Sequence, residues 1–222
     1  MDTSGGKLDE LQKRVLKSLA VVRPPFILGG GGALAGVHLA HRKTRDLDLF
    51  WREQTQLGDI PGLIETLLTE EGLAVSPLQR SPLFVQLRVA DASSVVVLDL
   101  IAEPTSSVEP PWLCRIGHSE ILVDTPHAIL TEKLCALLER SELRDLMDIE
   151  ALVGSGQDLN SAIADAPRRD SGFSPFTLAW VLRDWEVTKI ANAAGLSEAD
   201  GERLESFRQS LIDQLIAPDR TA

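Results

Sequence analysis

The fold is decided by two nearby stretches of sequence, Leu28-Gly-Gly-Gly-Gly-Ala-Leu34 and Arg45-Asp-Leu-Asp-Leu-Phe-Trp51. In the first stretch, the apolar run 26–28 predicts a short buried strand, and the four glycines predict a tight turn. Residues 33–40 then have the composition of a helix. Strand, glycine turn and helix together bring backbone N–H groups and a helix N-terminus to one place, where they can approach a phosphate closely.

The second stretch predicts a strand with two carboxylates on one face. Alternation places Asp46 and Asp48 on one side of this strand, and Leu47 and Leu49 on the other. Magnesium prefers oxygen ligands, usually one or two carboxylates with phosphate oxygens and water. Nucleotidyl transfer needs such an ion to neutralise the triphosphate, and two aspartates at this spacing can share it. A glycine turn or an Asp-x-Asp triplet alone is common in proteins, but their order and spacing here favour a catalytic site.

A third carboxylate, Asp99, interrupts the apolar segment Val95–Ala102, which predicts another strand. Alternation puts Asp99 on the same face as Val95 and Val97. A carboxylate inside a central strand is costly to bury unless it is paired or bound to a metal. We therefore expect Asp99 to be the third metal ligand. The alternative is an aspartate at a strand end, held by a backbone donor or an arginine.

The predicted helix over residues 126–140 carries Lys133 inside its apolar stripe, between Ile129 and Leu137. Its side chain therefore points toward other protein or a cleft, from which it could reach a β- or γ-phosphate. The alternative is that it extends along the apolar surface into solvent. In the next predicted helix, Arg144 and Asp148 are four residues apart, which predicts a surface salt bridge.

The net charge of −11 restricts the possible partners. Proteins that coat duplex DNA normally present a broad basic face, so this composition argues against a duplex DNA partner. An RNA acceptor requires basic residues gathered at one place. The one dense basic run, residues 41–45, ends at Arg45 beside the predicted metal ligands, so we expect Arg45 to contact the nucleotide. A protein acceptor or partner fits the acidic composition as well.

The cysteines and the hydropathy suggest the compartment. Cys114 and Cys135 have no nearby Cys or His at ligand spacing, which argues against a zinc site or a disulfide framework and fits a reducing cytoplasm. The most apolar segment, residues 95–102, is short and contains an aspartate, so no membrane span is predicted. We expect a cytoplasmic protein.

The predicted elements give an α+β protein: a mixed β-sheet flanked by helices, with a C-terminal helical module. Residues 1–125 are expected to form the α/β core, and residues 126–222 a helical module that completes the active-site cleft. In chain order the predicted elements are a helix over 8–19, a strand over 26–28, a helix over 33–40, a strand over 45–51, a helix over 60–72, strands over 73–78, 84–90 and 95–102, strands near 113 and 121, and helices over 126–140, 143–153, 158–166, 175–187 and 197–216.

Residues 26–152 resemble the AbiEii/AbiGii-type toxin nucleotidyltransferases. Residues 28–34 and 41–50 resemble the opening motif of that family, Thr131–Leu137 its lysine helix, and Arg144–Asp148 its closing motif. The resemblance implies the minimal nucleotidyltransferase fold, with a nucleoside triphosphate as substrate. It also implies transfer of a nucleotide to an acceptor, such as the 3′ end of tRNA or a protein, and control by a cognate antitoxin.

The same resemblance implies roles for particular residues. Asp46, Asp48 and Asp99 would hold Mg²⁺ or Mn²⁺, Lys133 would bind a phosphate, and Asp148 would have a supporting or basic role. Backbone groups of residues 30–32, namely Gly30, Gly31 and Gly32, would lie against the triphosphate.

One position departs from the family pattern, because Gly32 stands where the family has a hydroxyl that would contact a phosphate. Its loss removes a charge-assisted hydrogen bond of ~1.5–3 kcal/mol. Altered donor preference or weakened activity would both fit. The alternatives to an active enzyme are a catalytically inactive nucleotide-binding or regulatory protein and a toxin–antitoxin partner with the same fold.

Overall fold

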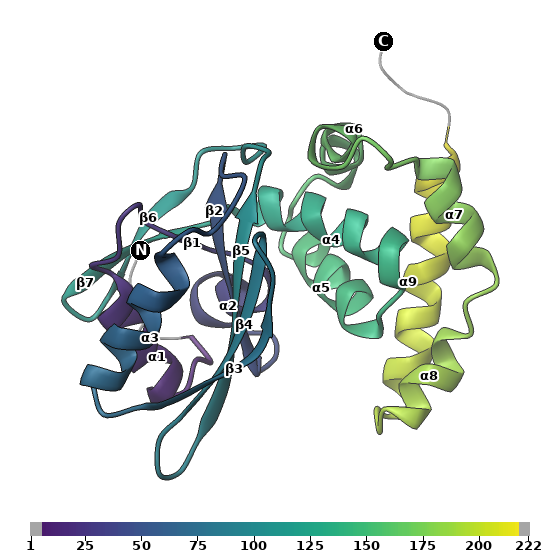
Figure 1. Cartoon of the computed structure of the whole chain (residues 1–222). Helices are drawn as coiled ribbons and strands as arrows, with labels where there is room; N and C mark the ends of the chain where they lie inside the picture. The colour runs from purple at the N-terminus through teal and green to yellow at the C-terminus, as the bar shows by residue number, and fades with distance from the viewer. Residues whose placement is uncertain (1–5, 218–222) are drawn as a thin grey trace. The chain divides into compact units, whose positions relative to one another are not determined.

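The computed structural model describes residues 6–217, and the chain divides between Pro126 and His127 into two compact units. The first unit contains the β-sheet and the second is helical (Figure 1). This arrangement confirms the predicted α+β class. No helix in the described part of the chain is both long and apolar enough to cross a membrane.

The first unit is built on one mixed sheet of seven strands, counted over residues 6–217, in the order β3-β4-β5-β2-β1-β7-β6. The strands are β1 (Ile27–Leu28), β2 (Asp46–Arg52), β3 (Ala74–Arg80), β4 (Phe84–Ala90), β5 (Val95–Glu103), β6 (Trp112–Ile116) and β7 (Ser119–Val123). The central strand β2 is parallel to β5 and antiparallel to β1, and β1 is parallel to β7. The outer pairs β3–β4, β4–β5 and β6–β7 are antiparallel.

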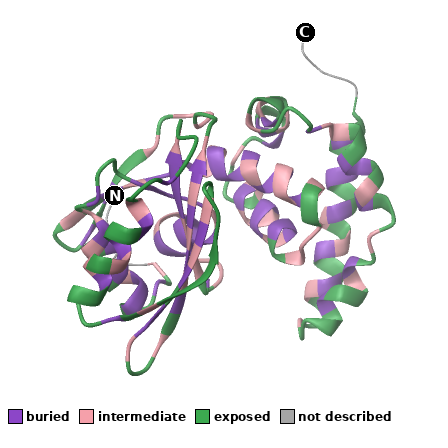
Figure 2. Cartoon of the chain, viewed as in Figure 1, coloured by how far each residue is buried: buried purple, intermediate pink, exposed green. Residues whose placement is uncertain are grey.

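One face of this sheet is buried under helices. The helices of the first unit are α1 (Glu10–Leu19), α2 (Gly30–Ala33), the π-helical turn η1 (Leu34–His38) and α3 (Ile60–Glu70). Helix α1 packs against α3 and contacts β5, and α2 contacts β2. Buried residues lie along the central strands of the sheet (Figure 2). Along β5 they alternate with more exposed ones, and Val96, Leu98 and Leu100 are buried. We call this side the helix-covered face.

Helix α1 begins at a capping box that the local sequence explains. The Asp9 side chain accepts from the Gln12 backbone N–H at 2.8 Å, and Gln12 Oε1 accepts from the Asp9 N–H at 2.9 Å. Such a cap contributes about 1 kcal/mol. Gln12 Nε2 also donates to the Thr44 carbonyl at 3.0 Å. Helix α1 therefore holds the residue at which the chain enters β2.

The second unit is a packed set of helices: α4 (Pro126–Arg140), α5 (Leu143–Gly154), α6 (Leu159–Arg169), α7 (Pro175–Arg183), α8 (Val187–Ala193) and α9 (Glu198–Ile216). The long helix α9 packs against α5, α7 and α8. Its inner positions include Leu204, Leu211 and Leu215, which are buried. This helix provides much of the core of the unit.

The structure differs from the sequence prediction at the ends of several helices. The helix predicted over residues 175–187 ends earlier, at Arg183 of α7, and the following helix α8 (Val187–Ala193) was not predicted. Arg208 of α9 donates to the carbonyls of Leu182 and Arg183. A guanidinium that bonds to the last carbonyls ends the helix, and this contact joins residues far apart in the sequence. The helix predicted to begin at residue 33 begins at Gly30, because burial of the glycines outweighs their poor helix propensity.

Candidate active site

Asp48 of β2 and Asp99 of β5 are direct neighbours in the parallel register of the two strands. Asp46 lies two residues before Asp48 and therefore projects from the same side of the sheet. We call this side, opposite the helix-covered face, the carboxylate face. The three aspartates are partly exposed. Asp99 projects from the same face as Val95 and Val97, which is the face that alternation predicted and the more exposed side of β5.

Two polar side chains orient these carboxylates. Thr44 Oγ1 donates to Asp46 Oδ1 at 2.6 Å, and Gln86 Nε2 of β4 donates to Asp99 Oδ1 at 2.9 Å. Sequence reasoning missed Gln86. It lies directly opposite Asp99 in the antiparallel β4–β5 pair, whose turn is closed by Asp91 and Ser94. Counting back from that predicted hairpin turn would have found the pair.

The glycine turn lies directly against Asp48. The Gly29 N–H donates to the Asp48 carbonyl at 3.0 Å, and Gly30 has a φ of +50°. A Cβ at Gly30 would lie 2.1 Å from Asp48 Oδ2, so no other residue fits there without displacing the carboxylate. A Cβ at Gly31 would meet Thr44 Oγ1 at 3.0 Å. The turn and the carboxylates therefore form one site at the end of β1.

Gly32 points away from this site. A Cβ there would lie 3.0 Å from Leu28 Cδ1 and 3.1 Å from Leu47 Cδ2, both in the buried core. A hydroxyl side chain at this position would begin in the core and not beside the carboxylates. We expected that glycine at position 32 removes a phosphate contact. The direction of its Cβ does not support this expectation, because a side chain there would point into the core.

A buried ionic cluster, which the sequence did not reveal, lies behind the turn. Asp124, which follows β7, is fully buried; its Oδ2 is 2.9 Å from Arg52 NH2, and Arg52 also pairs with Glu103. The Asp124 N–H donates to the Leu28 carbonyl at 2.9 Å. His38 Nε2 lies 2.8 Å from the Asp124 carbonyl. Burial lowers the pKa of His38, although that hydrogen bond partly opposes the shift, so the neutral imidazole donates. Through these two backbone contacts, Asp124 is bonded to Leu28, before the glycine turn, and to His38, in the helical segment after it.

The helical unit contains a second buried cluster, centred on Lys133. Its Nζ is 2.8 Å from Asp145 Oδ1 and 2.9 Å from Asp148 Oδ2, and all three side chains are buried. Burial disfavours the ammonium, but the charges of Asp148 and Asp145 outweigh it and raise the pKa of Lys133. Arg140 donates to both oxygens of Asp145, at 2.9 and 3.1 Å. Burial opposes the charge on Asp145, but its bonds to Arg140 and Lys133 lower its pKa.

This cluster decides between the two alternatives for Lys133, which points toward other protein and does not extend into solvent. It also corrects one expectation: Asp148 is not part of a surface salt bridge, because its side chain is fully buried beside the lysine. Arg144 pairs with Glu142 at 2.5 Å. The sequence analysis also missed Asp145, although it lies between Arg144 and Asp148 in the same helix.

Arg45 immediately precedes β2, and its carbonyl accepts from the Val97 N–H at 3.2 Å. Its side chain is exposed, and no described residue bonds to its guanidinium. A basic group is thus present one residue before Asp46.

The donor set of the carboxylate face fits a hard cation that is completed by substrate. Among residues 6–217, no three or more His, Cys, Asp and Glu side chains are grouped closely enough to form a metal site alone. Magnesium usually needs only one or two carboxylates, because phosphate oxygens and water supply the remaining ligands. The neighbours Asp48 and Asp99, which are both partly exposed, match that requirement.

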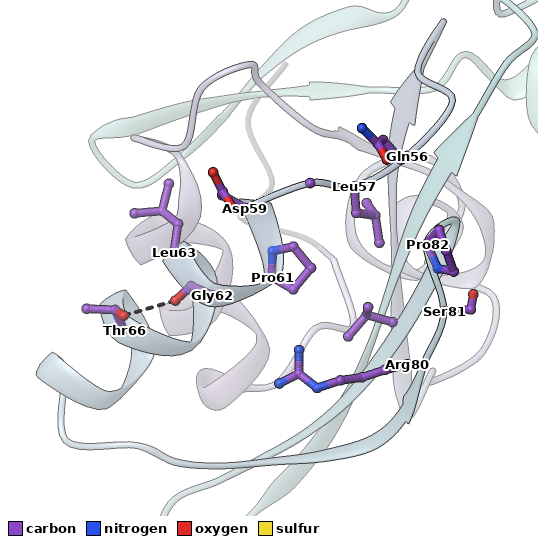
Figure 3. Close-up of a pocket in the computed structure, with 12 residues that line it drawn as sticks. Gln56, Leu57, Asp59, Pro61, Gly62, Leu63, Thr66, Arg80, Ser81 and Pro82 are labelled. Carbon is purple, nitrogen blue, oxygen red and sulfur yellow. Dashed lines mark hydrogen bonds between the residues drawn. The ribbon is translucent and has the colours of Figure 1, made fainter.

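A cavity of the first unit lies apart from the carboxylate face. It has a volume of about 780 Å³ and is lined by Leu57, Pro61, Arg80 and other residues at the start of α3 and the turn between β3 and β4 (Figure 3). Val85 lines it too and is the cross-strand neighbour of buried Leu100. Cross-strand neighbours project from the same face, so this cavity belongs to the helix-covered face and is separate from the aspartates.

The sequence over residues 14–220 matches the family model described as nucleotidyl transferase AbiEii toxin, type IV TA system. The protein is therefore a nucleotidyltransferase. Within that class, the chain belongs to the AbiEii toxin family. No curated protein matches it.

The chain is also similar to solved structures, and the fold is shared with the first of these. JHP933 from Helicobacter pylori is 17% identical, with a TM-score of 0.52 over 94% of each chain. The antibiotic-resistance factor ANT(2'')-Ia is 16% identical, with a TM-score of 0.48 over 74% of this chain and 94% of that chain. An antigenic nucleotidyltransferase-like protein from Paracoccidioides brasiliensis is 14% identical, with a TM-score of 0.44 over 72% of this chain and 86% of that chain.

Proposed function

We propose that this nucleotidyltransferase transfers a nucleoside monophosphate from a nucleoside triphosphate to the 3′ end of an RNA, such as tRNA, or to a protein. The observation that carries the proposal is the contact between the glycine turn and Asp48, whose neighbour in the next strand is Asp99. A phosphate-binding turn beside paired carboxylates is the arrangement that a metal-bound triphosphate needs.

In this proposal, Asp46, Asp48 and Asp99 hold Mg²⁺ or Mn²⁺, which neutralises the triphosphate and polarises the α-phosphate when bound. Thr44 and Gln86 fix the directions of their carboxylates. Backbone groups of the turn, at Gly30, Gly31 and Gly32, lie along the phosphates, and Arg45 adds a positive charge.

The reaction itself exchanges one phosphate ester bond for another. An acceptor hydroxyl oxygen attacks the α-phosphorus, the bond from that phosphorus to the β-phosphate oxygen breaks, and pyrophosphate leaves. The hydroxyl proton passes to solvent water, because Asp148, for which the family resemblance implied a supporting or basic role, is fully buried and paired with Lys133. Most of the rate enhancement would come from positioning and charge neutralisation.

Lys133 has two roles in the proposal. Its ion pairs with Asp145 and Asp148 join α4 to α5, and this structural role follows from their burial. An ammonium has three N–H donors, and the two carboxylates take two of them, so one donor remains for a phosphate oxygen.

The alternative, an inactive nucleotide-binding or regulatory protein, was favoured by the missing hydroxyl at Gly32. Because Gly32 faces Leu28 and Leu47, that feature does not weaken the site. The family is that of type IV toxin–antitoxin systems, so we also propose that a cognate antitoxin opposes the protein.

The test is transfer of label from each α-labelled nucleoside triphosphate, with magnesium, into total RNA and total protein. Asp48→Asn is the loss-of-function control, and Asp91→Asn, in the exposed hairpin turn of the same sheet, is the matched charge control. Label that depends on Asp48 but not on Asp91 supports the proposal and identifies donor and acceptor. Absence of label with all four triphosphates, from a folded protein that binds nucleotide, would favour the regulatory alternative.

A further inference from the structure

The carboxylate face continues beyond the aspartates onto β4 and β3. The antiparallel register places Gln86 opposite Asp99 and Arg88 opposite Val97. On the far side, Gln79 lies opposite Gln86, and Ser76 lies opposite Arg88. Because cross-strand neighbours project from one face, these four side chains form a continuation of the site. We call Ser76, Gln79, Gln86 and Arg88 the β4 strip.

The β4 strip is suited to an anion. Arg88 is its one charged member, and its side chain is exposed. No described residue forms a hydrogen bond or ion pair with its guanidinium. The other three side chains are uncharged, although the chain as a whole carries a net charge of −11. A guanidinium with all its donors available binds phosphate oxygens in a fixed, often bidentate geometry.

The order of the strands separates the side of the sheet toward which pyrophosphate would leave from the side at which the acceptor would bind. Across the sheet, the glycine turn at the end of β1 comes first, followed by Asp48 on β2, Asp99 on β5 and the β4 strip. If the turn binds the outer phosphates, as proposed above, pyrophosphate leaves toward β1. In-line displacement requires the attacking oxygen to arrive from the opposite side of the α-phosphorus. That side is the β4 strip.

We propose that the β4 strip is the acceptor subsite, and that Arg88 binds a phosphate of a nucleic-acid strand whose terminal hydroxyl attacks. A diagonal neighbour in a sheet lies about 7–8 Å away between Cα atoms, so the long Arg88 side chain reaches beside Asp99 without occupying the metal ligands. This inference rests on the proposed function. Arg88 is a binding residue for the acceptor and takes no part in the bond exchange.

The charge of the strip favours a nucleic acid over a protein. A nucleic-acid terminus always carries a phosphate one nucleotide from the attacking hydroxyl, so a fixed cation at this point contacts every such acceptor. A protein hydroxyl has no anion at a constant distance. A protein acceptor would therefore be indifferent to Arg88.

The kinetic experiment compares Arg88→Ala and Arg88→Lys with Arg80→Ala. Arg80 on β3 lies opposite Val85, so it belongs to the helix-covered face, and its replacement changes the net charge equally. Initial rates of label transfer are measured against total RNA and, separately, against the nucleoside triphosphate. We expect Arg88→Ala to raise the KM for RNA about tenfold or more, the value of one charge-assisted hydrogen bond. The KM for the triphosphate should change less than twofold, and Arg88→Lys should recover part of the loss.

A binding experiment does not depend on catalysis. A fluorescent single-stranded oligoribonucleotide with a free 3′ hydroxyl is titrated with the full chain at several salt concentrations. We expect loss of one phosphate contact in Arg88→Ala to reduce the slope of log K against log salt by about 0.7. Arg80→Ala should leave the slope unchanged.

The outcomes separate the two proposals. If no triphosphate supports transfer but the oligonucleotide binds with the expected dependence on Arg88, the proposed function fails and the subsite stands. A higher KM for the triphosphate in Arg88→Ala would place the arginine on the leaving-group side and overturn the inference. Equal behaviour of the Arg88 and Arg80 variants, label transfer to protein that ignores Arg88, or no oligonucleotide binding by the unchanged chain would overturn it as well.

Discussion

Replacing Gly30 by alanine tests the contact on which the proposed site rests. The φ of +50° at Gly30 costs an alanine about 1–2 kcal/mol of backbone strain. The new Cβ would start 2.1 Å from Asp48 Oδ2, whereas real Cβ contacts begin near 3.0 Å. The carboxylate or the turn must therefore shift by about 1 Å. A misplacement of that size in a catalytic group costs about a hundredfold in rate.

The matched control is Gly72→Ala, which has the strain without the clash. Gly72 has a φ of +76°, and its Cβ would meet nothing within 4 Å. Both variants should lose about 1–2 kcal/mol in urea unfolding, with Gly30→Ala the less stable because of the contact with Asp48. Only Gly30→Ala should lose about a hundredfold in kcat for label transfer and need more magnesium for half-maximal rate. Full activity in Gly30→Ala, or an equal loss in Gly72→Ala, would refute the proposed arrangement.

Four further outcomes follow from the described contacts. Gly32→Ser should not raise the rate of label transfer, because its Cβ points into the core; a rate increase would contradict this geometry. Asp145→Asn should lower the free energy of unfolding by about 3 kcal/mol in denaturant titrations, since it leaves the buried Lys133 with one carboxylate. Lowering the pH from 7 to 5 should reduce stability through His38, because burial lowers its pKa in the folded state and the unfolded state therefore binds a proton first, near pH 6.5. The Tm of His38→Gln should depend less on pH than the Tm of the unchanged chain. An equal dependence of Tm on pH would exclude this cause. Burial raises the pKa of Cys135 to about 12, so iodoacetamide at pH 8 should not modify it in the folded protein, as mass spectrometry of the intact chain would show.

Local sequence patterns were sufficient for the parts of the fold whose causes are local. Alternation identified β4 over Phe84–Ala90, and helical spacing identified α4 over Pro126–Arg140, both with the bounds found in the structure. Both elements have an unbroken period of apolar residues and a clear turn or proline at their ends. The end of α7 at Arg183, four residues before the predicted end at 187, could not be predicted, because Arg208, which bonds to the end of α7, comes from another helix.

The same distinction between local and tertiary causes applies to the site. Asp46 and Asp48 could be proposed from sequence because their spacing alone puts both on one face of a strand. Gln86 acts on Asp99 only through the pairing of β4 with β5, and Asp124 reaches Arg52 only because β1 brings β7 beside β2.

A side chain that contacts a residue of a neighbouring strand can be identified from the sequence only when the register of the two strands is also predicted. The β4–β5 register is the case where the prediction was possible, because a short hairpin turn fixes every opposite pair along the two strands. Counting outward from that turn pairs Gln86 with Asp99 and Arg88 with Val97, as the structure has them. The residues of the β4 strip are therefore encoded in hairpin register, whereas the spacing of the Asp-x-Asp motif alone identifies only Asp46 and Asp48.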